Sequence, residues 1–589
     1  MNIEIARMFR EIAAIHEYEN VKWKPQAYRR AAMTLESLED EADEIYRKEG
    51  LKGLMALPGI GKDLAGKIVE YITTGKIKHY EELKKDYPID FEKVTSVPGM
   101  GPKTAIKLYK ELGVKTLDDL KDAAAKHKIK RLGGFGEKKE ADMLKGIAML
   151  EKTKGRLLLG EALPMAERML ERLRENKDII RADLVGSSRR MKETVGDLDF
   201  LVVAKSPKKV MDFFVSLPEV ESVQSKGLKK SSVFLKIGID SDIRVFSEES
   251  YGSAMMYFTG SKSHNIKLRT IAIDKGYKLN EYGLFQRGTD KLQKTAGKLQ
   301  EITGKQMPSK TEEDIYRQLG ADWIPPEMRE DEGEIELALK RRLPKLIDYN
   351  DVRGDTQIHT TWSDGANTIE EMAIKAKGMG YEYICITDHT VKGLPVAQGL
   401  ADKDFKKQRE EIDAANSKVK GLKVFQGAEV NIMPDGSLDA SDKTLSELDF
   451  VLAGVHSRFK MSRKDMTNRM VKAIKNDYVH MISHPTGRLI NGRDEYDLDI
   501  DIALDAAKEY GKIMDINAHP NRLDLGPQNI KKAIGKGVKL SISTDSHSVE
   551  HMRYMRFGIG TARRGWAEKK DVINTLGLKD FEKIIKRKQ

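Results

Sequence analysis

Two carboxylates, Asp197 and Asp199, lie two residues apart at the start of the apolar run 200–203, which is typical of a β-strand. Side chains at positions i and i+2 of a strand point to the same face. Two carboxylates on one face repel each other unless a cation lies between them, so the spacing suits a divalent metal that holds phosphates. Upstream, the tight turn at Gly186 and Ser187 offers N–H groups and a hydroxyl to a phosphate. The alternative interpretation is a surface strand with solvated aspartates.

Further motifs follow in a definite order. Asp242 lies in a second apparent strand, with Asp240 as a competing carboxylate, and the segment 257–261 reads Tyr-Phe-Thr-Gly-Ser. Together with the Gly-Ser turn and the Asp-x-Asp pair, these motifs resemble the palm of DNA polymerase family X, the polymerase beta group. Asp242 is preferred over Asp240 because the family pattern is Asp, apolar, Arg, apolar.

The resemblance to family X implies a set of site residues. It implies two ions, Mg²⁺ or Mn²⁺, and the catalytic metal ligands Asp197, Asp199 and Asp242. It implies that the incoming dNTP contacts Gly186, Ser187, Arg190, Tyr257, Phe258, Gly260 and Asn265. The ordinary interpretation of Tyr257 and Phe258 is core packing, as for most aromatic side chains.

The composition bounds the class of protein. With 589 residues the chain forms several domains, and its net charge of +11 fits a polyanionic partner without proving one. The single cysteine, Cys385, excludes an intramolecular disulfide and fits a reducing, cytoplasmic compartment. We find no signal peptide and no window long enough for a membrane helix, so we expect no membrane partner. We expect a monomer.

The first 152 residues show helical periodicity broken by Pro-Gly-x-Gly segments. Glycines in a turn between two helices leave backbone N–H groups open, so a DNA phosphate can bind there without sequence preference. One copy could be an ordinary glycine-capped helix turn, but two good copies and a weaker third, 132–138, favour nucleic acid. The expected DNA-binding residues are Gly59, Gly61, Gly99, Gly101 and Lys103.

In family X the first domain can act as a 5′-deoxyribose-phosphate lyase through a lysine Schiff base. Alignment of the first hairpin to the family places Lys67 at the nucleophile position. An amine attacks only when it is neutral, and nothing in the sequence shows that Lys67 is. A phosphate contact on an exposed helix face is an equally good interpretation.

The segment after the palm is rich in lysine and arginine, and a contact with the DNA backbone is expected there. Lys267 and Arg269 continue the helix that contains Asn265, toward the template. The segment 280–284 predicts the turn of a thumb hairpin, and 323–327 closes the thumb. Residues 327–336 are acidic and predict an interdomain connector, followed by a short basic helix over 337–347.

A second set of polar residues follows strand-like apolar runs in the last third of the chain. Eight of the 12 histidines lie between His359 and His551. Strand–helix alternation with polar groups at the strand ends is typical of a barrel whose site lies at the open end. His, Asp and Glu together suit Zn²⁺ or Mn²⁺. One such histidine would be read as structural, but five histidines and three carboxylates predict a metal site.

This pattern resembles the PHP (polymerase and histidinol phosphatase) domain, a distorted (β/α)7 barrel with a trinuclear metal site. The resemblance implies the ligands His359, Asp364, His389, Glu429, His456, His484, Asp545 and His547. The family usually has His-x-His at the first position, where this chain has Gln357, whose carbonyl oxygen is expected as a weaker ligand. His480, His519 and His551 are treated as non-ligands.

The sequence as a whole therefore predicts a multidomain protein. The expected domains are a helix-hairpin-helix lyase-like domain (1–83), fingers (84–152), an α/β nucleotidyltransferase palm (153–262), a thumb (263–326), a linker (327–349) and a PHP barrel (350–589). The resemblance implies a DNA-directed DNA polymerase that fills gaps in base excision repair on gapped or primer-template DNA. It also implies a 3′–5′ exonuclease in the PHP domain, with an apurinic-site endonuclease as a further expected activity of that domain.

Three rival interpretations stay open. The PHP domain could be only a structural clamp, given Gln357. The palm could belong to another nucleotidyltransferase, such as an RNA-tailing enzyme, although the hairpins and the segment 257–261 argue against it. A non-catalytic DNA-binding protein is the third, and the three palm carboxylates argue against that.

Overall fold

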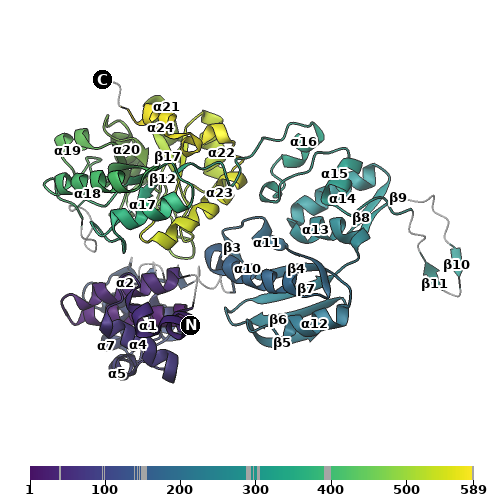
Figure 1. Cartoon of the computed structure of the whole chain (residues 1–589), viewed down its shortest axis with the longest axis horizontal. Coiled ribbons are helices and arrows are strands. Elements are labelled where there is room, and N and C mark those ends of the chain that lie inside the picture. Colours follow the sequence, from purple (N-terminus) through teal and green to yellow (C-terminus); the bar gives the residue numbers. More distant parts are fainter. Residues whose placement is uncertain are drawn as a thin grey trace.

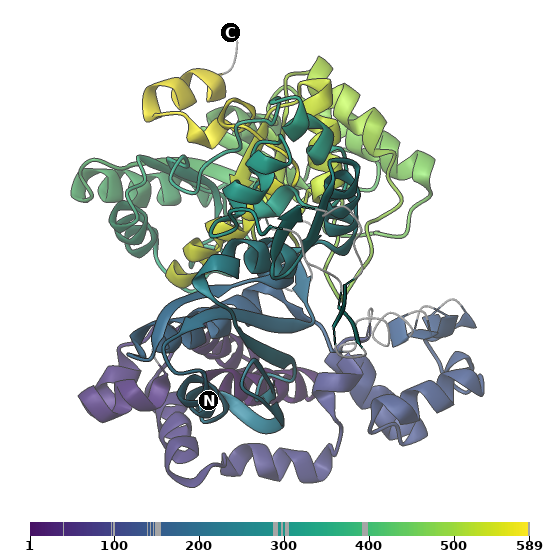
Figure 2. The same ribbon diagram turned by 90° about the vertical axis from the view of Figure 1, so that its right-hand side faces the viewer.

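The computed structural model describes residues 1–38, 41–95, 97, 100–137, 139–141, 143–144, 146–147, 155–286, 293–295, 298–300, 305–390 and 399–586. Helices gather in an N-terminal bundle, a mixed sheet and a helical thumb follow, and a parallel barrel lies at the C-terminal end (Figures 1 and 2). Among these residues no helix combines the length and the apolar character needed to cross a bilayer.

The N-terminal part is helical, as expected. Its elements are α1 Asn2–Tyr18, α2 Lys24–Ser37, α3 Ala42–Met55, α4 Lys62–Thr74, α5 Lys78–Asp86, α6 Phe91–Thr95, α7 Pro102–Leu112, α8 Leu117–Ala125 and η1 Ile129–Arg131. Two buried apolar clusters lie one after the other along this segment, one built around Phe9 and Ile68, the other around Phe91 and Leu108. Helix α1 contributes to both, since its Ile15 packs in the second cluster.

The palm is a five-stranded sheet in the order β2-β4-β7-β6-β5. Its elements are β1 Leu157–Leu158, α10 Leu159–Glu175, β2 Ile179–Leu184, α11 Gly186–Arg189, β3 Thr194–Val195, β4 Asp197–Ala204, α12 Pro207–Val215, β5 Val220–Lys226, β6 Lys230–Leu235 and β7 Asp240–Val245. Strands β4 and β7 are parallel, and the other neighbours are antiparallel. The predicted strand at 200–203 is longer than expected, because β4 begins at Asp197 itself.

The thumb follows through η2 Glu248–Ser250 and α13 Tyr251–Thr259. It contains α14 Lys262–Asp274, β8 Tyr277–Asn280, β9 Gly283–Gln286, β10 Gln293–Thr295, β11 Lys298–Gln300, α15 Glu312–Gln318 and η3 Pro326–Met328. The predicted hairpin at 280–284 is confirmed by the pairing of β8 with β9.

The predicted basic helix over 337–347 is wrong. The helix in this segment is α16 Glu334–Leu339, and it ends well before Pro344. Its apolar residues Ile335 and Ala338 pack into the core of the thumb, beside Trp566 of the barrel. The connector is therefore part of a packed interface, because its apolar face has a core to join.

The C-terminal domain is a parallel seven-stranded barrel, as the sequence predicted. Its strands are β12 Gly354–Ile358, β13 Tyr383–Ile386, β14 Lys423–Asn431, β15 Phe450–Gly454, β16 Met481–Ile482, β17 Ile513–Asn517 and β18 Leu540–Ser543, adjacent in that order. Backbone bonds such as His359 N–H to the Ser546 carbonyl bring β12 back to β18. The strands are buried on both faces, which explains their nearly continuous apolar sequence.

Helices cover the outside of the barrel (Figure 1). They are α17 Ile369–Gly378, α18 Phe405–Lys418, α19 Asp442–Glu447, α20 Arg463–Ile474, α21 Ile500–Glu509, α22 Pro527–Lys536, η4 Val549–Tyr554, α23 Met555–Arg564, η5 Lys569–Asp571, η6 Ile573–Thr575 and α24 Leu578–Ile585. Two details differ from expectation: Glu429 lies inside β14 rather than after it, and β17 was missed in the sequence.

The palm and the barrel share one hydrophobic core. Leu523 and Phe557 of the barrel are buried in the same apolar cluster as the palm residues Phe200 and Phe214. Gly160 at the start of α10 lies so close to the barrel that an added Cβ atom would come within 2.4 Å of Pro520. Because this interface buries apolar side chains of both domains, the palm and the barrel form one unit.

Candidate active sites

Strand register brings the palm carboxylates together. In the parallel pair β4–β7, Asp199 lies opposite Asp242 and Asp197 lies opposite Asp240. Arg244 joins two of them, since its Nη1 donates to Asp199 Oδ1 over 2.7 Å and its Nη2 donates to Asp242 Oδ2 over 2.7 Å. Asp240 instead accepts from Gln224 Nε2 over 2.6 Å. The structure therefore places Asp242, rather than Asp240, in one hydrogen-bonded group with Asp199.

Two cations sit where a metal site is expected. Besides Arg244, Lys230 Nζ lies 2.8 Å from Asp242 Oδ2. Burial and the neighbouring Asp197 carboxylate raise the pKa of Asp199, whereas hydrogen bonds from Lys230 and Ser232, acting against burial, lower the pKa of Asp242. Carboxylates this close are stable only with compensating positive charge, and divalent ions supply it more strongly than two side chains do.

The predicted phosphate turn packs directly against this group. Gly186 has φ of +71° and starts the short helix α11, and a Cβ atom added there would come within 3.0 Å of Asp199 Oδ2. Ser187 lies in that helix, partly exposed. Arg190 Nε donates to Glu330 Oε1 over 3.1 Å, and its Nη1 donates to the carbonyl of Thr259. The turn thus lies next to the carboxylates, as a nucleotide-binding site requires.

The residues expected around the sugar and base also come together. Asn265 Nδ2 donates to the Tyr257 carbonyl over 2.7 Å, which ties α14 to the end of α13. The Arg244 guanidinium lies 4.6 Å from the centre of the Phe258 ring. Gly260 ends α13 with φ of +70°. Phe258 is therefore coupled to the carboxylates through Arg244, which the sequence alone did not reveal.

Two residues of helix α14 that were predicted to bind DNA, Lys267 and Arg269, have different surroundings. Lys267 Nζ lies 2.9 Å from Asp331 Oδ1 and 2.5 Å from Glu336 Oε1, so its charge is paired with two acidic residues of the connector. Arg269 is exposed. The sequence pattern could not show that Lys267 faces an acidic segment more than sixty residues away.

The hairpin glycines stand at helix starts. Gly59 has φ of +71°, and Gly61 is the N-cap of α4. Gly101 is the N-cap of α7, and Lys103 follows it, with Nζ 3.3 Å from Glu17. Cβ atoms added at Gly61 or Gly101 would meet nothing within 4 Å. Both helix starts are therefore open to a phosphate. Gly99 lies outside the described residues.

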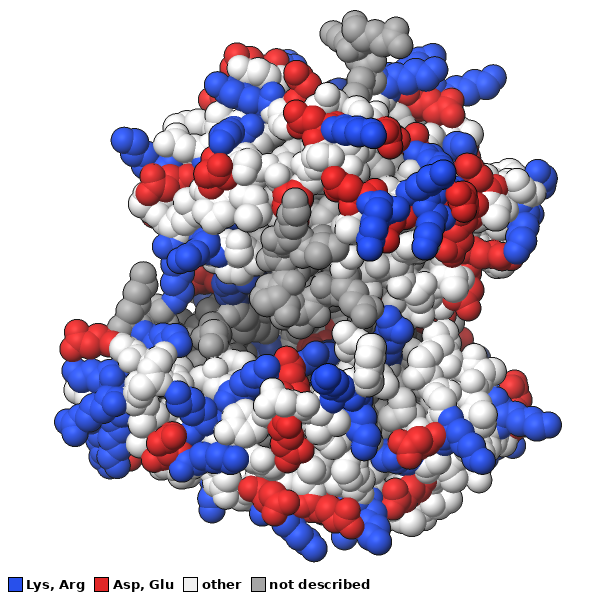
Figure 3. All heavy atoms as spheres, turned by 90° about the vertical axis from the view of Figure 1, so that its left-hand side faces the viewer, with Lys and Arg blue, Asp and Glu red and all other residues white. Residues whose placement is uncertain are grey.

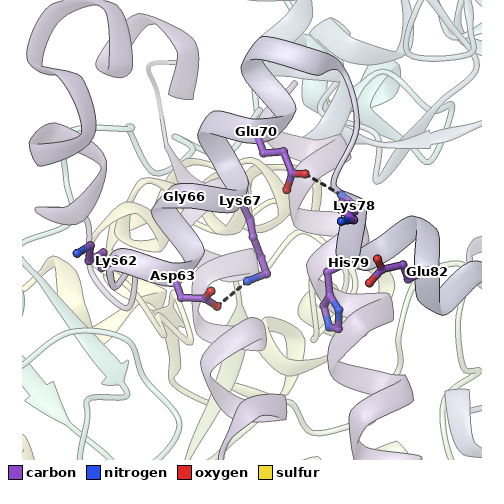
Figure 4. Close-up of a pocket in the computed structure, with 8 residues that line it drawn as sticks. All are labelled: Lys62, Asp63, Gly66, Lys67, Glu70, Lys78, His79 and Glu82. Carbon is purple, nitrogen blue, oxygen red and sulfur yellow. Dashed lines mark hydrogen bonds and ion pairs between the residues drawn. The ribbon is translucent and has the colours of Figure 1, made fainter.

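Lys67 lines an open cavity of about 750 Å³ in the N-terminal domain (Figure 4). The cavity is lined by Lys62, Asp63, Gly66, Lys67, Glu70, Lys78, His79 and Glu82. Lys67 Nζ donates to Asp63 Oδ2 over 2.6 Å, and its side chain is 16% exposed. The amine must leave this carboxylate before it can attack a substrate.

The eight residues predicted for the PHP site converge at one end of the barrel. Glu429 is the centre: its Oε1 lies 3.2 Å from His456 Nε2 and 2.9 Å from His484 Nε2, and its Oε2 lies 3.3 Å from His359 Nε2. His359 Nε2 also lies 3.1 Å from Asp545 Oδ1.

The remaining predicted ligands complete the same cluster. His389 Nδ1 lies 3.5 Å from Glu429 Oε2, and His547 Nε2 lies 3.4 Å from Asp364 Oδ1. Within the described part of the chain, three groups of residues have possible ligand atoms close enough to share an ion. They are His359, Asp364, His389 and His547; His389, Glu429 and His456; and His359, Glu429 and Asp545.

The donor set fits divalent metal ions. Several buried polar atoms of the cluster have no hydrogen-bond partner in the part of the chain that the structure describes, among them His359 Nδ1 and His484 Nδ1. Buried polar groups without partners are costly, so a missing partner is implied. Imidazole nitrogens with carboxylate oxygens suit Zn²⁺ or Mn²⁺ chemically.

Gln357 does not behave as expected. Its Nε2 donates to Glu429 Oε2 over 3.0 Å and to Asp545 Oδ1 over 3.3 Å, while its Oε1 accepts from the hydroxyls of Ser483 and Ser543. The carbonyl oxygen predicted as a weak metal ligand therefore faces away from the cluster. Gln357 instead donates to two of the predicted carboxylate ligands, because an amide nitrogen can only donate.

The structure also reveals supporting residues that were overlooked in the sequence. Asn517 Nδ2 donates to Asp545 Oδ2 over 3.1 Å, and Arg522 Nε lies 3.6 Å from the same oxygen. Asp515 accepts from the backbone N–H of His484 over 3.0 Å. The segment 513–516, apolar except for Asp515 and followed by Asn517, was the available signal. His480 is structural, since both of its ring nitrogens bond to backbone groups.

The surface carries both signs of charge. Lys and Arg side chains are spread over the N-terminal helices and the barrel on the face shown in Figure 3, with Asp and Glu between them. On this face the positive charge is therefore distributed over the N-terminal helices and the barrel rather than confined to one patch.

Comparison with family models identifies four parts of the chain. Residues 1–77 match a helix-hairpin-helix domain, residues 91–148 a SAM-like helix-hairpin-helix tandem, residues 254–330 a DNA polymerase beta thumb, and residues 355–519 a PHP domain. Together with the sheet and the two side-chain clusters, these matches define a polymerase-beta-like nucleotidyltransferase joined to a PHP barrel.

Comparison with known proteins shows the family directly. The chain is 38% identical over 587 residues, 99% of both chains, to the DNA polymerase/3′-5′ exonuclease PolX of Bacillus subtilis. The chain belongs to this family of PHP-containing family X polymerases. Its barrel region is also 34% identical to a probable phosphatase of Thermoanaerobacter sp. (strain X514) over 247 residues, 40% of this chain and 96% of that protein.

Proposed function

We propose that the chain is a DNA-directed DNA polymerase with a 3′–5′ exonuclease in its PHP barrel, filling short gaps during base excision repair. The observation that carries the polymerase half is the group formed by Asp199, Asp242 and the Gly186 turn. The likeness over 99% of the chain to a polymerase/exonuclease supports both halves. Its substrates would be dNTPs and gapped or primer-template DNA, and it would act as a monomer in the cytoplasm.

In the polymerase half, residues of the chain would bind and orient the metal ions and the incoming nucleotide. Asp197, Asp199 and Asp242 would hold two Mg²⁺ or Mn²⁺ ions, which stabilise charge on the entering and leaving oxygens when bound. Gly186, Ser187 and Arg190 would hold the triphosphate, while Tyr257, Phe258 and Asn265 would line the sugar and base. The primer 3′-OH is thereby aligned with the α-phosphate, and this positioning supplies much of the rate.

In the barrel, His359, Glu429 and Asp545 together with the other five ligands would hold Mn²⁺ or Zn²⁺. When bound, such ions act as Lewis acids and make water more acidic. Arg522, beside Asp545, is placed to bind a phosphodiester through its guanidinium. Apurinic-site endonuclease activity belongs to the same proposal, because it also cleaves a phosphodiester.

A labelled primer on gapped DNA tests this function in one assay. With Mg²⁺ or Mn²⁺ and dNTPs we expect extension to the end of the gap, and without dNTPs we expect shortening from the 3′ end. Full-length protein that neither extends nor shortens the primer with either metal would refute the proposal. Extension without shortening would instead favour the barrel as a structural clamp.

The hairpins give a separate prediction. Gly61→Val with Gly101→Val should weaken binding to gapped DNA by about tenfold, because bulky side chains block backbone N–H groups from the phosphates. The loss should be the same for DNA of any sequence, since only phosphates are contacted. Gly535→Val in α22 is a matched control, as its added Cβ also meets nothing within 4 Å. A loss confined to some sequences in a binding titration would contradict the prediction.

The lyase activity is tested by borohydride trapping on an incised abasic site. Lys67→Ala should lower the yield of the trapped adduct by tenfold or more if Lys67 is the nucleophile. Lys62→Ala and Lys78→Ala are controls, since both lysines line the same cavity. If the yield is unchanged in Lys67→Ala but falls in Lys62→Ala or Lys78→Ala, the Schiff base is assigned to the lysine whose replacement lowers the yield.

A further inference from the structure

Three cations from two domains surround one carboxylate beside the phosphate turn. Arg190 Nε donates to Glu330 Oε1 over 3.1 Å, Lys192 Nζ lies 3.5 Å from the same oxygen, and Arg564 Nη1 lies 4.0 Å from it. Arg190 and Lys192 follow α11 of the palm, whereas Arg564 is the last residue of α23 in the barrel. The barrel thus contributes a cation to the surroundings of the proposed nucleotide site.

The Arg564 guanidinium is buried without a full set of partners. Its side chain is 8% exposed, and among the described residues its Nε and Nη1 find no hydrogen-bond partner. A guanidinium carries five N–H donors and stays charged in proteins. Burial lowers the pKa of Arg564, and burial together with Arg564 lowers the pKa of Lys192. The three cations around Glu330 therefore lack enough negative charge to balance them.

Neighbouring acids do not correct this shortage, because they are already paired. Glu193 Oε1 accepts from Arg488 Nη2 over 2.7 Å, and Glu332 accepts from Gln528 and pairs with Lys531. Including those partners, five cations face three carboxylates, which leaves an excess of positive charge around Glu330. A partly buried positive excess of this kind favours an anion with several charges.

Packing holds α23 against the turn. A Cβ atom added at Gly560 would come within 2.7 Å of Met191 Cε, between Arg190 and Lys192 in the sequence. Phe557, on the same helix, is buried in the palm core. The end of α23 therefore has a defined position relative to the phosphate turn.

We propose that Arg564 of the PHP barrel binds the polyphosphate tail of the incoming nucleotide together with Arg190 and Lys192, and that Glu330 takes this place when no nucleotide is bound. The inference rests on the proposed polymerase function. Arginine suits the role because its N–H groups pair with phosphate oxygens in charge-assisted hydrogen bonds. The nuclease barrel is then also part of the polymerase site.

The test uses the full-length chain and the variant Arg564→Gln. We expect the KM for dNTP in gap filling to rise about tenfold, with kcat within about twofold, because one charge-assisted bond to the tail is lost. Binding of inorganic tripolyphosphate, measured by calorimetry, should weaken by a similar factor. Arg564→Lys should restore part of the affinity, and Glu330→Gln should strengthen tripolyphosphate binding, since it removes the competing carboxylate.

The matched control is Arg556→Gln on the same helix, which removes a surface pair with Glu167 of the palm and should leave the KM unchanged. Equal effects of Arg556→Gln and Arg564→Gln would overturn the proposal, as would an unchanged KM in Arg564→Gln. A loss of affinity for gapped DNA alone would assign the cations to the DNA backbone and also overturn it. If the parent adds no nucleotide, the polymerase proposal fails, while tripolyphosphate binding still decides the role of Arg564.

Discussion

Asp199→Ala is expected to abolish nucleotide addition while leaving 3′–5′ degradation intact. Asp199 faces Asp242 across the parallel strands, and it packs against Gly186 of the phosphate turn. Removing a metal ligand removes several kcal/mol of charge stabilisation, so a fall in kcat of about 10³-fold or more is expected. Single-turnover primer extension with Mg²⁺ measures the loss. Asp197→Ala should behave in the same way.

Asp240→Ala provides the matched control for this experiment. Asp240 lies on the same strand as Asp242, but it pairs with Gln224 rather than with Arg244. It should retain extension within a few-fold of the parent, whereas Asp242→Ala should not. Extension near the parental rate in Asp199→Ala would remove the palm assignment, and loss only in Asp240→Ala would move the third ligand to that residue.

Asp545→Ala and His359→Ala are expected to abolish 3′–5′ degradation and leave primer extension within about twofold. His359 Nε2 lies 3.1 Å from Asp545 Oδ1 within the cluster. Asp545 also accepts hydrogen bonds from Gln357 Nε2 and Asn517 Nδ2. Loss of a ligand to the cluster should again cost about 10³-fold or more in cleavage rate. The bound metal per chain, measured by mass spectrometry of the purified protein, should fall as well.

His480→Gln is the control for histidine loss in the barrel, because both ring nitrogens of His480 bond to backbone groups, the N–H of Val451 and the carbonyl of Ile585. It should keep the parental metal content and cleavage. Degradation that persists in both Asp545→Ala and His359→Ala would place the nuclease elsewhere. Parental protein that degrades no DNA end with any divalent metal would establish the barrel as a clamp.

Much of the fold was predictable because its signals are local. The hairpin glycines mark helix starts, and the short apolar runs of the barrel mark strands buried on both faces. The length of β14 was not predictable, since its polar residues Glu429 and Asn431 break the apolar pattern although they are buried. The helix α16 was misplaced for a related reason: its extent depends on packing against the thumb rather than on its own composition.

The sequence by itself determined which residues are the candidates for the chemistry, because ligand types and spacing along a strand are local properties. Only the tertiary structure decided how they combine. Gln357 holds Glu429 and Asp545, Lys267 pairs with the connector, and Arg564 of the barrel lies beside Glu330, the partner of Arg190. Each of these contacts joins segments far apart in the chain, so its direction depends on strand register and domain packing, and neither is written in any short stretch of sequence.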